Sequence, residues 1–359
     1  MLAIGSDPYY LQSGFIVRMG ISILKKTVES FGRRRDLDCN DAEELLDPLI
    51  SETDETLMAE LFRAWDKKGI TENEIYSIAK LMRDRCTKVS TKHERFIDIV
   101  GTGGSRAKTF NVSTAAAFVV AGAGVAVAKH GNRAATSNSG SADVLSALGI
   151  EPAVDAATAE QCLNNIGICF MFAPNFHRLS PTLGKVRRGL GFPTVFNCVG
   201  PLCNPASAPH QLIGVWSKKM VPRIAGALAR LGTKRSWVVH GLDGLDEISV
   251  NADTIVAEVE GGSVRTFRLS PADLSLATRS LDSCRAASAE DSAALIRRVL
   301  ENAHNNTAAR SLVVMNAAAA VLIAGRTNDM QEALGIVEQS LAGGAALGKL
   351  DQLAAAVRV

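Results

Sequence analysis

Apolar residues recur every three or four positions along the first quarter of the chain. Three segments have this spacing: residues 41–50, 56–65 and 72–82. The spacing is typical of amphipathic helices that bury one face. Asn40 and Thr71 are suited to cap the first and the third of these helices. Because no strand pattern interrupts residues 21–90, we expect them to form a small helical domain, preceded by an N-terminal extension at residues 1–20.

In the rest of the chain, short apolar segments alternate with longer helical ones. The single segments that predict strands are residues 95–100, 193–198, 211–216 and 236–240. Two further segments flank Gly261-Gly262 and predict a β-hairpin. Such alternation is typical of an α/β fold with a mostly parallel central sheet. We therefore expect a small all-helical N-terminal domain at residues 21–90, joined by part of residues 170–192, and a larger α/β domain at residues 91–359.

Three glycines follow the first predicted strand. Gly101, Gly103 and Gly104 let the backbone turn sharply and approach a ligand closely. Residues 111–114 then offer side-chain caps to a helix that begins near Ala115. Strand, loop and helix start bring unpaired N–H groups and the positive end of the helix dipole together, which favours an anion. The loop matches neither the Walker nor the dinucleotide pattern, so a plain tight turn is an equal alternative for the loop alone.

A second polar loop follows the next apolar segment, residues 125–129. Its side chains carry hydrogen-bond donors or positive charge: Lys129, His130, Asn132, Arg133, Ser137, Ser139 and Ser141. A structural turn does not need so many donors. We therefore expect phosphate to bind between the two loops.

Three further clusters of polar residues lie beyond these loops. An apolar run, residues 170–176, precedes Arg187 and suits an aromatic acid, because guanidinium binds carboxylate bidentately; the alternative is an arginine on a solvated helix face. Residues 197–204 contain two asparagines that either close over a ligand or turn the chain. Asp246 and Glu247 form an acidic turn by default, yet they also supply the hard oxygen ligands that Mg²⁺ needs beside phosphate.

Composition narrows the class of protein. Lys+Arg number 39 against 37 for Asp+Glu, so the net charge of +2 gives no general case for nucleic-acid binding. The 7 cysteines are odd in number and form no Cys-x-x-Cys, which indicates reduced thiols rather than a disulfide frame or a zinc site. The apolar runs are too short to span a membrane, and the first residues lack the pattern of a signal peptide. We expect a cytoplasmic protein that contacts neither nucleic acid nor membrane.

Seven motifs occur in an order that is specific for one enzyme family. They are Gly101-Thr-Gly-Gly104, Asn111-Val-Ser-Thr114, Lys129-His-Gly-Asn-Arg133, Gly140-Ser-Ala-Asp-Val-Leu145, Val186-Arg-Arg188, Phe196-Asn-Cys-Val-Gly-Pro-Leu-Cys-Asn-Pro205 and Asp243-Gly-Leu-Asp-Glu247. From about Ile21 the chain resembles anthranilate phosphoribosyltransferase, a glycosyltransferase of tryptophan biosynthesis. The resemblance implies phosphoribosyl pyrophosphate (PRPP), anthranilate and Mg²⁺ as ligands. It also implies a homodimer that forms through the helical domain, with the active site in the cleft between the domains.

The resemblance also assigns residues by position. PRPP would meet Gly101, Gly104, Ser105, Thr109, Asn111, Val112, Ser113, Thr114, Lys129, His130, Gly131, Asn132, Arg133, Ser137 and Ser141. Anthranilate would meet Gly101, His130, Asn132, His177 and Arg187, and Mg²⁺ would meet Ser113, Asp246 and Glu247. The chain departs from the family twice: Ser105 stands where an aspartate is usual, and Arg178 follows His177 where a proline is usual.

No residue is assigned as a catalytic base. The aromatic amine of anthranilate is largely unprotonated near neutral pH, so positioning it against C1 of the ribose can supply much of the rate. Two alternatives stay open: a nucleoside phosphorylase of the same fold, and a non-enzymatic relative that binds nucleic acid. The motif at residues 129–133 and the carboxylates of Asp246 and Glu247 argue against the first, and the near-neutral charge argues against the second.

Overall fold

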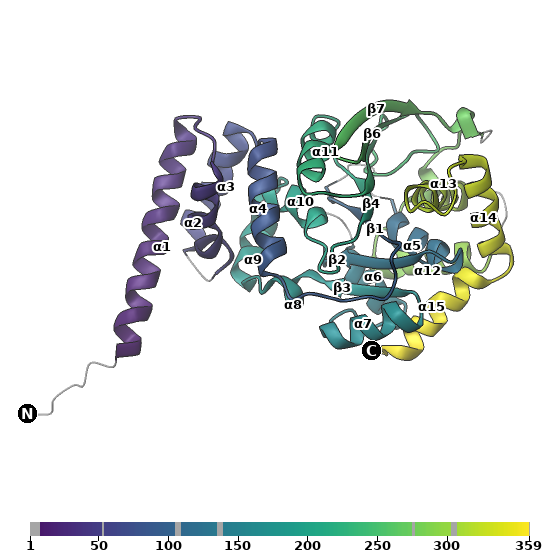
Figure 1. Ribbon diagram of the computed structural model, residues 1–359, viewed down its shortest axis with the longest axis horizontal. Helices are drawn as coiled ribbons and strands as arrows, with labels where there is room; N and C mark the ends of the chain where they lie inside the picture. Colours follow the sequence, from purple (N-terminus) through teal and green to yellow (C-terminus); the bar gives the residue numbers. More distant parts are fainter. Residues whose placement is uncertain are drawn as a thin grey trace, which may run out of the picture.

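The N-terminal part of the protein consists of helices alone. The computed structural model describes residues 8–51, 54–104, 109–134, 139–274, 277–302 and 307–358, with side chains from residue 19 onward. Its first elements are α1 (Pro8–Gly32), α2 (Cys39–Ile50), α3 (Glu55–Lys68) and α4 (Glu72–Arg85). The three predicted helices are confirmed, and α1 begins within the stretch expected to be an extension. Figure 1 shows α1 as a long arm at the outer edge of this group.

Side-chain caps set where these helices begin. Asp38 caps α2, since its Oδ1 accepts a hydrogen bond from the Asp41 amide at 2.8 Å. The prediction of Asn40 as this cap is wrong because Asp38 starts the helix earlier. Thr71 caps α4 as predicted, and Glu74 completes a reciprocal capping box with it.

Strands and helices alternate in the rest of the chain. The elements are β1 (Phe96–Gly101), α5 (Val112–Gly122), β2 (Ala126–Gly131), α6 (Ser141–Ala147), α7 (Ala156–Asn165), β3 (Ile168–Phe172), α8 (Ala173–His177), α9 (Pro181–Leu190), α10 (Val195–Val199), a 3₁₀ helix (Gly200–Leu202), β4 (His210–Gly214), α11 (Met220–Arg230), β5 (Arg235–Gly241), β6 (Thr254–Glu260), β7 (Ser263–Leu269), two 3₁₀ turns (Pro271–Leu274 and Asp282–Cys284), α12 (Ala289–Leu300), α13 (Ala308–Ile323), α14 (Met330–Ala342) and α15 (Ala345–Ala356). The strand predicted at residues 193–198 is wrong. Thr194 and Asn197 form a capping box there, and this starts the short helix α10 instead. The other predicted strands and the hairpin are confirmed within about two residues.

One sheet of 7 strands forms the centre of this part, with the order β3-β2-β1-β4-β5-β6-β7. The first five strands in that order are parallel, and β6 and β7 join antiparallel, so the mostly parallel sheet is confirmed. The connection after β1 leads through α5 to β2, on one side, whereas the connection after β4 leads through α11 to β5, on the other. The carboxyl ends of β1 and β4 therefore flank a topological switch point, where open α/β sheets bind ligands.

The two faces of the sheet belong to two hydrophobic cores. Neighbouring side chains alternate between them, as Ile99 and Val100 do in β1. One core joins the sheet to α5 and to the C-terminal helices α12 to α15. The other joins it to α11 and to the N-terminal helices, including Leu24 of α1 and Trp65 of α3. In addition, α9 packs against α3 and α10 against α4 (Figure 1). The division into domains at residue 90 stays a prediction.

Two features bear on the expected environment of the protein. All seven cysteines are free, and of these only Cys39 is exposed. Among the helices that the structure describes, none combines the length and the hydropathy needed to cross a membrane.

Candidate functional site

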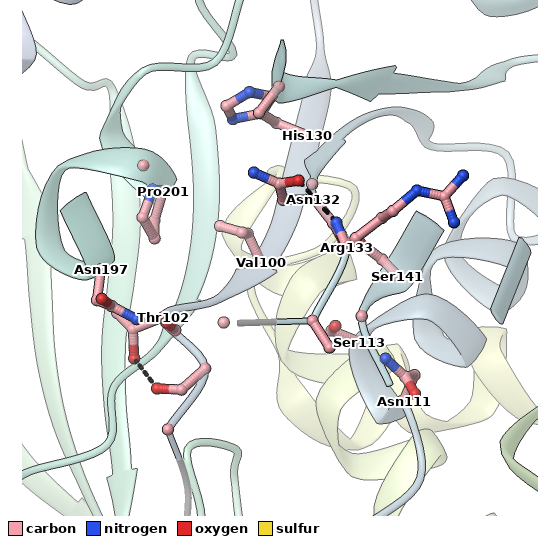
Figure 2. A pocket seen from close by; sticks show the side chains of 18 of the residues that line it. Val100, Thr102, Asn111, Ser113, His130, Asn132, Arg133, Ser141, Asn197 and Pro201 are labelled. Carbon is pink, nitrogen blue, oxygen red and sulfur yellow. Dashed lines mark hydrogen bonds between the residues drawn. The ribbon is translucent and has the colours of Figure 1, made fainter. Parts of the chain in front are cut away.

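A cavity of about 240 Å³ opens at the carboxyl ends of β1 and β2. The loops after β1, β2 and β5 and the start of α5 line its polar half. Apolar side chains that include Met82, Leu179 and Phe196 line the half toward the N-terminal helices. In Figure 2, Thr102 and Asn197 lie on one side of the cavity, and the loop residues of β2 and α5 lie on the other. The cavity therefore lies at the switch point of the sheet and extends to the helical part.

Most of the residues predicted from the sequence line this one cavity. They are Gly101, Gly104, Thr109, Asn111, Ser113, Lys129, His130, Gly131, Asn132, Arg133, Ser141, His177, Arg187, Asp246 and Glu247. Val112 and Thr114 do not line it, because their side chains are buried on the inner side of α5, where the Thr114 hydroxyl has no hydrogen-bond partner. Contact of these two residues with PRPP stays a prediction. Ser105 and Ser137 lie outside the described residues.

Close backbone packing places the two acidic residues beside the glycine loop. A Cβ atom at Gly214 of β4 would lie 1.6 Å from the carbonyl oxygen of Asp246. At Gly101 it would lie 3.4 Å from Oδ2 of the same residue. Gly104 has a φ angle of +86°, which side chains rarely permit. The glycines thus let the loop after β5 lie directly on β1 and β4, which brings Asp246 and Glu247 into the cavity.

Lys129 places a positive charge at the start of α5. Its Nζ donates hydrogen bonds to the Ile99 carbonyl at 2.6 Å and to Ser113 Oγ at 3.3 Å. Burial lowers the pKa of Lys129, and the negative charges of Asp98 and Glu247 oppose that shift. The helix dipole of α5 adds positive potential at the same point. An anion in this half of the cavity meets both sources of charge.

Asp246 and Glu247 place two neighbouring carboxyl groups in the cavity, near the ammonium of Lys129. Burial first, and then the negative charge of Asp246, raise the pKa of Glu247 to about 8. A divalent cation at this pair would favour the ionised carboxylates and so lower the pKa of Glu247 again. The described residues contain no cluster of three or more His, Cys, Asp or Glu side chains that could hold a metal on its own. Two carboxylates with the Ser113 hydroxyl form a partial ligand set, which fits Mg²⁺ because that ion is commonly completed by phosphate oxygens and water.

Arg187 of α9 enters the apolar half with neutral partners only. Its Nε donates to Thr194 Oγ1 and its Nη2 to Asn197 Oδ1, both at 3.2 Å. The guanidinium also lies 5.5 Å from the ring centroid of Phe196. Burial lowers the pKa of Arg187 to about 10, with a smaller contribution from Arg188, so it stays charged at neutral pH. No carboxylate in the described part of the chain pairs with it, which leaves N–H donors for an acid. The solvated-face alternative is wrong for Arg187 and holds for the exposed Arg188.

His130 and His177 form a neutral pair at the wall of the cavity. Their Nε2 atoms lie 3.3 Å apart, and both side chains are buried. Burial lowers the pKa of His177 to about 4, and it lowers the pKa of His130 well below its ordinary value. At neutral pH the two rings therefore share one hydrogen bond and carry no charge.

Asn111 and Arg133 are held mainly by the protein itself. Asn111 Oδ1 accepts hydrogen bonds from Ser139 Oγ and Ser292 Oγ, both at 2.8 Å. Arg133 Nη1 forms an ion pair with Asp143 Oδ1 at 3.0 Å. These contacts join the polar loops to α6 and α12 and fix their shape. A direct contact of either residue with phosphate stays a prediction.

The two asparagines at residues 197–204 have different roles. Asn197 lines the cavity and donates from Nδ2 to the Thr102 carbonyl at 3.0 Å. Asn204 turns the chain, since its Nδ2 donates to Asp98 Oδ2 and to the Ala128 carbonyl, both at 2.8 Å. The sequence left open whether Asn197 closes over a ligand, and it did not single out the buried Asp98. The spacing of Thr194 and Asn197, a capping-box pattern, was the signal that could have identified the first.

Comparison with known proteins places this cavity in a family. Residues 93–347 match the a/b domain of a glycosyl transferase family. The anthranilate phosphoribosyltransferase of Moorella thermoacetica is 42% identical over 316 residues, which cover 88% of this chain and 93% of that protein. The protein of the same name from Azorhizobium caulinodans is 43% identical over 323 residues, with coverage of 90% and 93%. The chain belongs to the anthranilate phosphoribosyltransferase family.

Solved structures of that family agree with the fold. The anthranilate phosphoribosyltransferase of Thermus thermophilus superimposes with a TM-score of 0.83 at 35% identity and covers 92% of this chain and 98% of its own. The Saccharomyces cerevisiae enzyme, in complex with PRPP and Mg, gives a TM-score of 0.84 at 28% identity, with coverage of 93% and 98%. The family predicted from the seven motifs is confirmed, and so is the predicted α/β fold class.

Proposed function

We propose that the protein transfers the 5-phosphoribosyl group of PRPP to the amine of anthranilate and releases pyrophosphate. The product is N-(5-phosphoribosyl)anthranilate, and the reaction is the second step from chorismate to tryptophan. One observation carries the proposal: a single cavity joins an anion site to an apolar compartment that ends at Arg187, an arginine without an acidic partner among the described residues. The names of relatives 42% and 43% identical to the chain support it. Neither a nucleoside phosphorylase nor a nucleic-acid-binding protein has such support.

The glycine loop and α5 would stabilise the leaving group. Displacement at C1 of the ribose builds negative charge on the departing pyrophosphate. Backbone N–H groups of Gly103 and Gly104 and the ammonium of Lys129 line this half of the cavity and would stabilise that charge. The bond from Lys129 Nζ to the Ile99 carbonyl already orients the ammonium without a ligand. Mg²⁺ held by Ser113, Asp246 and Glu247 would neutralise pyrophosphate oxygens. The charge on these groups supports a strongly ionic substrate in this half of the cavity.

The other half would orient anthranilate. The planar guanidinium of Arg187 suits a bidentate contact with the carboxylate, and Phe196 and Leu179 offer apolar contact to the ring. With the ring held at two points, the amine has one direction in which to approach C1. The neutral rings of His130 and His177 do not compete for the carboxylate. No side chain is needed to remove a proton before the attack, because the amine is already neutral.

Loss of anthranilate fluorescence tests the proposed reaction directly. The purified protein, PRPP, anthranilate and Mg²⁺ should together give a steady loss, and omission of either PRPP or Mg²⁺ should stop it. A parallel reaction with a nucleoside and inorganic phosphate should release no base. Release of base, or stable fluorescence in the complete mixture, would reject the proposal.

The metal assignment has its own test. The double variant Asp246→Asn, Glu247→Gln keeps the size of both side chains but replaces the carboxylates with neutral amides. Turnover should be abolished because these oxygens are the hard ligands in the cavity, while anthranilate should bind as in the parent protein. Calorimetry with Mg²⁺ and pyrophosphate should show weaker binding. If the double variant turns over at the parent rate, the carboxylates do not hold the metal.

We further infer a homodimer that forms through the helical part of the chain. Met19 on α1 has 51% of its surface exposed, and Ile23, one turn further along the same face, is only partly buried. An apolar helix face of this kind suits a second copy of the chain. Sedimentation of the protein and of Met19→Glu tests this, since the charged side chain should shift the equilibrium toward the monomer. The cytoplasm is the proposed location, because seven free thiols suit a reducing compartment.

A further inference from the structure

The side-chain amide of Asn197 contacts both halves of the cavity. Its Nδ2 donates to the Thr102 carbonyl at 3.0 Å, on the glycine loop. Its Oδ1 accepts from Arg187 Nη2 at 3.2 Å and from the Thr194 amide at 2.9 Å. Asn197 is buried, with 7% of its surface exposed, so water does not compete freely for these bonds. One rigid planar group therefore connects the anion site to the guanidinium.

On the loop side, the amide fixes a peptide that shapes the anion site. Thr102 lies between Gly101 and Gly103, and its peptide with Gly103 is planar and trans. A bond that holds the Thr102 carbonyl toward Asn197 therefore turns the Gly103 N–H to the opposite side. The Thr102 amide is held separately, by the Gly214 carbonyl at 2.9 Å. The carbonyl is thus the point through which Asn197 controls the loop.

On the other side, Asn197 holds a charge that has no acidic partner among the described residues. Arg187 depends on the oxygens of Asn197 and Thr194 for its direction. A helix-capping role for Asn197 accounts for its bond to the Thr194 amide alone. It accounts neither for the bond to Thr102 nor for the bond to Arg187. The remaining two contacts connect the binding sites proposed for the two substrates.

We propose that Asn197 is a positioning residue that couples the two halves of the active site. The inference rests on the proposed function, which assigns pyrophosphate to the loop and the aromatic carboxylate to Arg187. A ligand on the loop fixes the Thr102 carbonyl. The carbonyl then fixes the side-chain amide of Asn197, and the amide fixes the guanidinium of Arg187. Ordering these groups costs conformational entropy. The second ligand binds an arginine that is already oriented, so this cost does not reduce its affinity again. By linkage, either ligand strengthens the other by the same factor.

The coupling is measured with ligands that do not react. Anthranilate is titrated by its fluorescence with Mg²⁺ present, once without and once with saturating inorganic pyrophosphate, which occupies the loop but cannot transfer a ribose. The ratio of the two dissociation constants is the coupling factor. For the parent protein we expect a ratio of about five or more, the lower end of common coupling energies. In Asn197→Leu the ratio should fall to one. Because each ratio is taken within one protein, a general loss of affinity cancels.

Two further variants make the test specific. Thr194→Val removes the other contact of Arg187 without touching Thr102, so it should weaken anthranilate binding and keep the ratio. Asn197→Asp keeps both acceptor contacts and the helix cap but cannot donate a hydrogen bond to the Thr102 carbonyl. Its ratio should therefore also fall to one. If Asn197→Leu does not fold, Asn197→Asp takes its place in the test. The inference is overturned if the parent protein has a ratio of one, or if both Asn197 variants keep the parent ratio. It is also overturned if the ratio falls to one in Thr194→Val. Turnover of the parent protein with PRPP is a separate readout, so failure of the proposed function is recognised independently.

Discussion

At the scale of single residues, Arg187 decides most about what the cavity accepts. Its two observed partners are neutral oxygens, so its charge is available to a ligand. Arg187→Ala should weaken anthranilate binding by about 1.5–3 kcal/mol, the range for hydrogen bonds to charged groups. That corresponds to roughly tenfold or more in affinity. Arg187→Lys should not restore it, because an ammonium lacks the planar fork. Calorimetry with anthranilate alone measures the loss.

PRPP with Mg²⁺ is the control ligand for the Arg187 variants. Measured in the absence of anthranilate, its affinity should hardly change, because its proposed contacts are the glycine loop and Lys129. Equal losses for both ligands would mean that Arg187 supports the fold. A loss confined to PRPP would reverse the proposed positions of the two substrates.

Arg178, which ends α8, has an unusual backbone conformation. Its φ angle is +51°, in the left-handed region, and its side chain is exposed. Arg178→Gly should stabilise the protein by up to about 1 kcal/mol, since strain is relieved while the unfolded chain gains some freedom. Arg178→Pro should destabilise it, because proline fixes φ near −65° and removes the amide that donates to the Pro174 carbonyl at 3.2 Å. Urea unfolding ranks the three proteins. A proline variant as stable as the parent would contradict the account.

At the scale of elements, one buried carboxylate holds the N-terminal helices together. Glu74 of α4 accepts hydrogen bonds from the Leu37 amide and from Trp65 Nε1, both at 3.0 Å. Lys68 of α3 forms an ion pair with it at 2.8 Å. Glu74→Ala should lower the free energy of unfolding by about 3–5 kcal/mol, because it leaves the N–H donors of Leu37, Trp65 and Thr71 without their acceptor, at about 1–3 kcal/mol each. Lys68 keeps Asp36 as an acidic partner, at 2.6 Å. Denaturant unfolding gives the value.

A matched control lies on the same helix. Lys80 and Asp84 form an exposed ion pair one turn apart, at 2.9 Å. Lys80→Ala should change the stability little, since water already solvates both charges. Similar losses in the Lys80 and Glu74 variants would show that α4 is sensitive to any change of charge, and not to the buried carboxylate in particular.

Periodicity predicted the long elements well and the short ones less well. The helices α2 to α4 repeat their apolar residues over three turns, so the pattern has enough length to be unambiguous. The helix α10 has only 5 residues, and its apolar run equally suits a buried strand. What decides in favour of a helix is the bond between the Thr194 amide and Asn197 Oδ1, at 2.9 Å. Such a bond depends on side-chain chemistry, which hydrophobic periodicity does not contain.

At the scale of the whole molecule, the candidate site divides into a predictable and an unpredictable part. The polar half could be predicted because its residues follow β1, β2 and β5, and parallel strands end at one edge of a sheet. In the apolar half, His177 and Arg187 were predicted, but Met82 and Leu179 were not, since they come from separate parts of the chain. Only the packing of α4, α9 and α10 brings them to one wall. Pattern and spacing report on neighbours in sequence, and Met82 lies far along the chain from the other residues of this wall.

The paired histidines make the stability of the folded chain sensitive to acid. In an unfolded chain a histidine titrates near pH 6.5, whereas the pKa of His177 is lowered to about 4 and that of His130 is also lowered. As pH falls from about 7 toward 4, the unfolded chain takes up protons that the folded chain refuses, so stability decreases. A tenfold difference in proton affinity between the folded and the unfolded chain corresponds to about 1.4 kcal/mol, and the pair therefore contributes on the order of a few kcal/mol.

Denaturant unfolding at neutral pH and near pH 5 measures this dependence. His177→Gln cannot take up a proton, so the difference in stability between the two conditions should shrink. Asp98, which accepts a hydrogen bond from the His130 amide, has its pKa raised to about 6 by burial and acts in the opposite direction in the same range. The comparison of variant and parent, rather than the parent curve alone, isolates the histidines. Equal differences in the two proteins would show that the acid response comes from other groups.

The uneven exposure of the cysteines makes the chain suitable for labelling at one position. Cys39, at the start of α2, is exposed, and the other six thiols are buried. A maleimide dye should therefore attach to the helical part and leave the sheet unmodified. Anthranilate fluoresces, so a ligand in the cavity can transfer its excitation to a dye chosen to absorb at its emission. The native chain would then report the distance between its helices and its substrate, without any engineered cysteine, while PRPP or pyrophosphate is added.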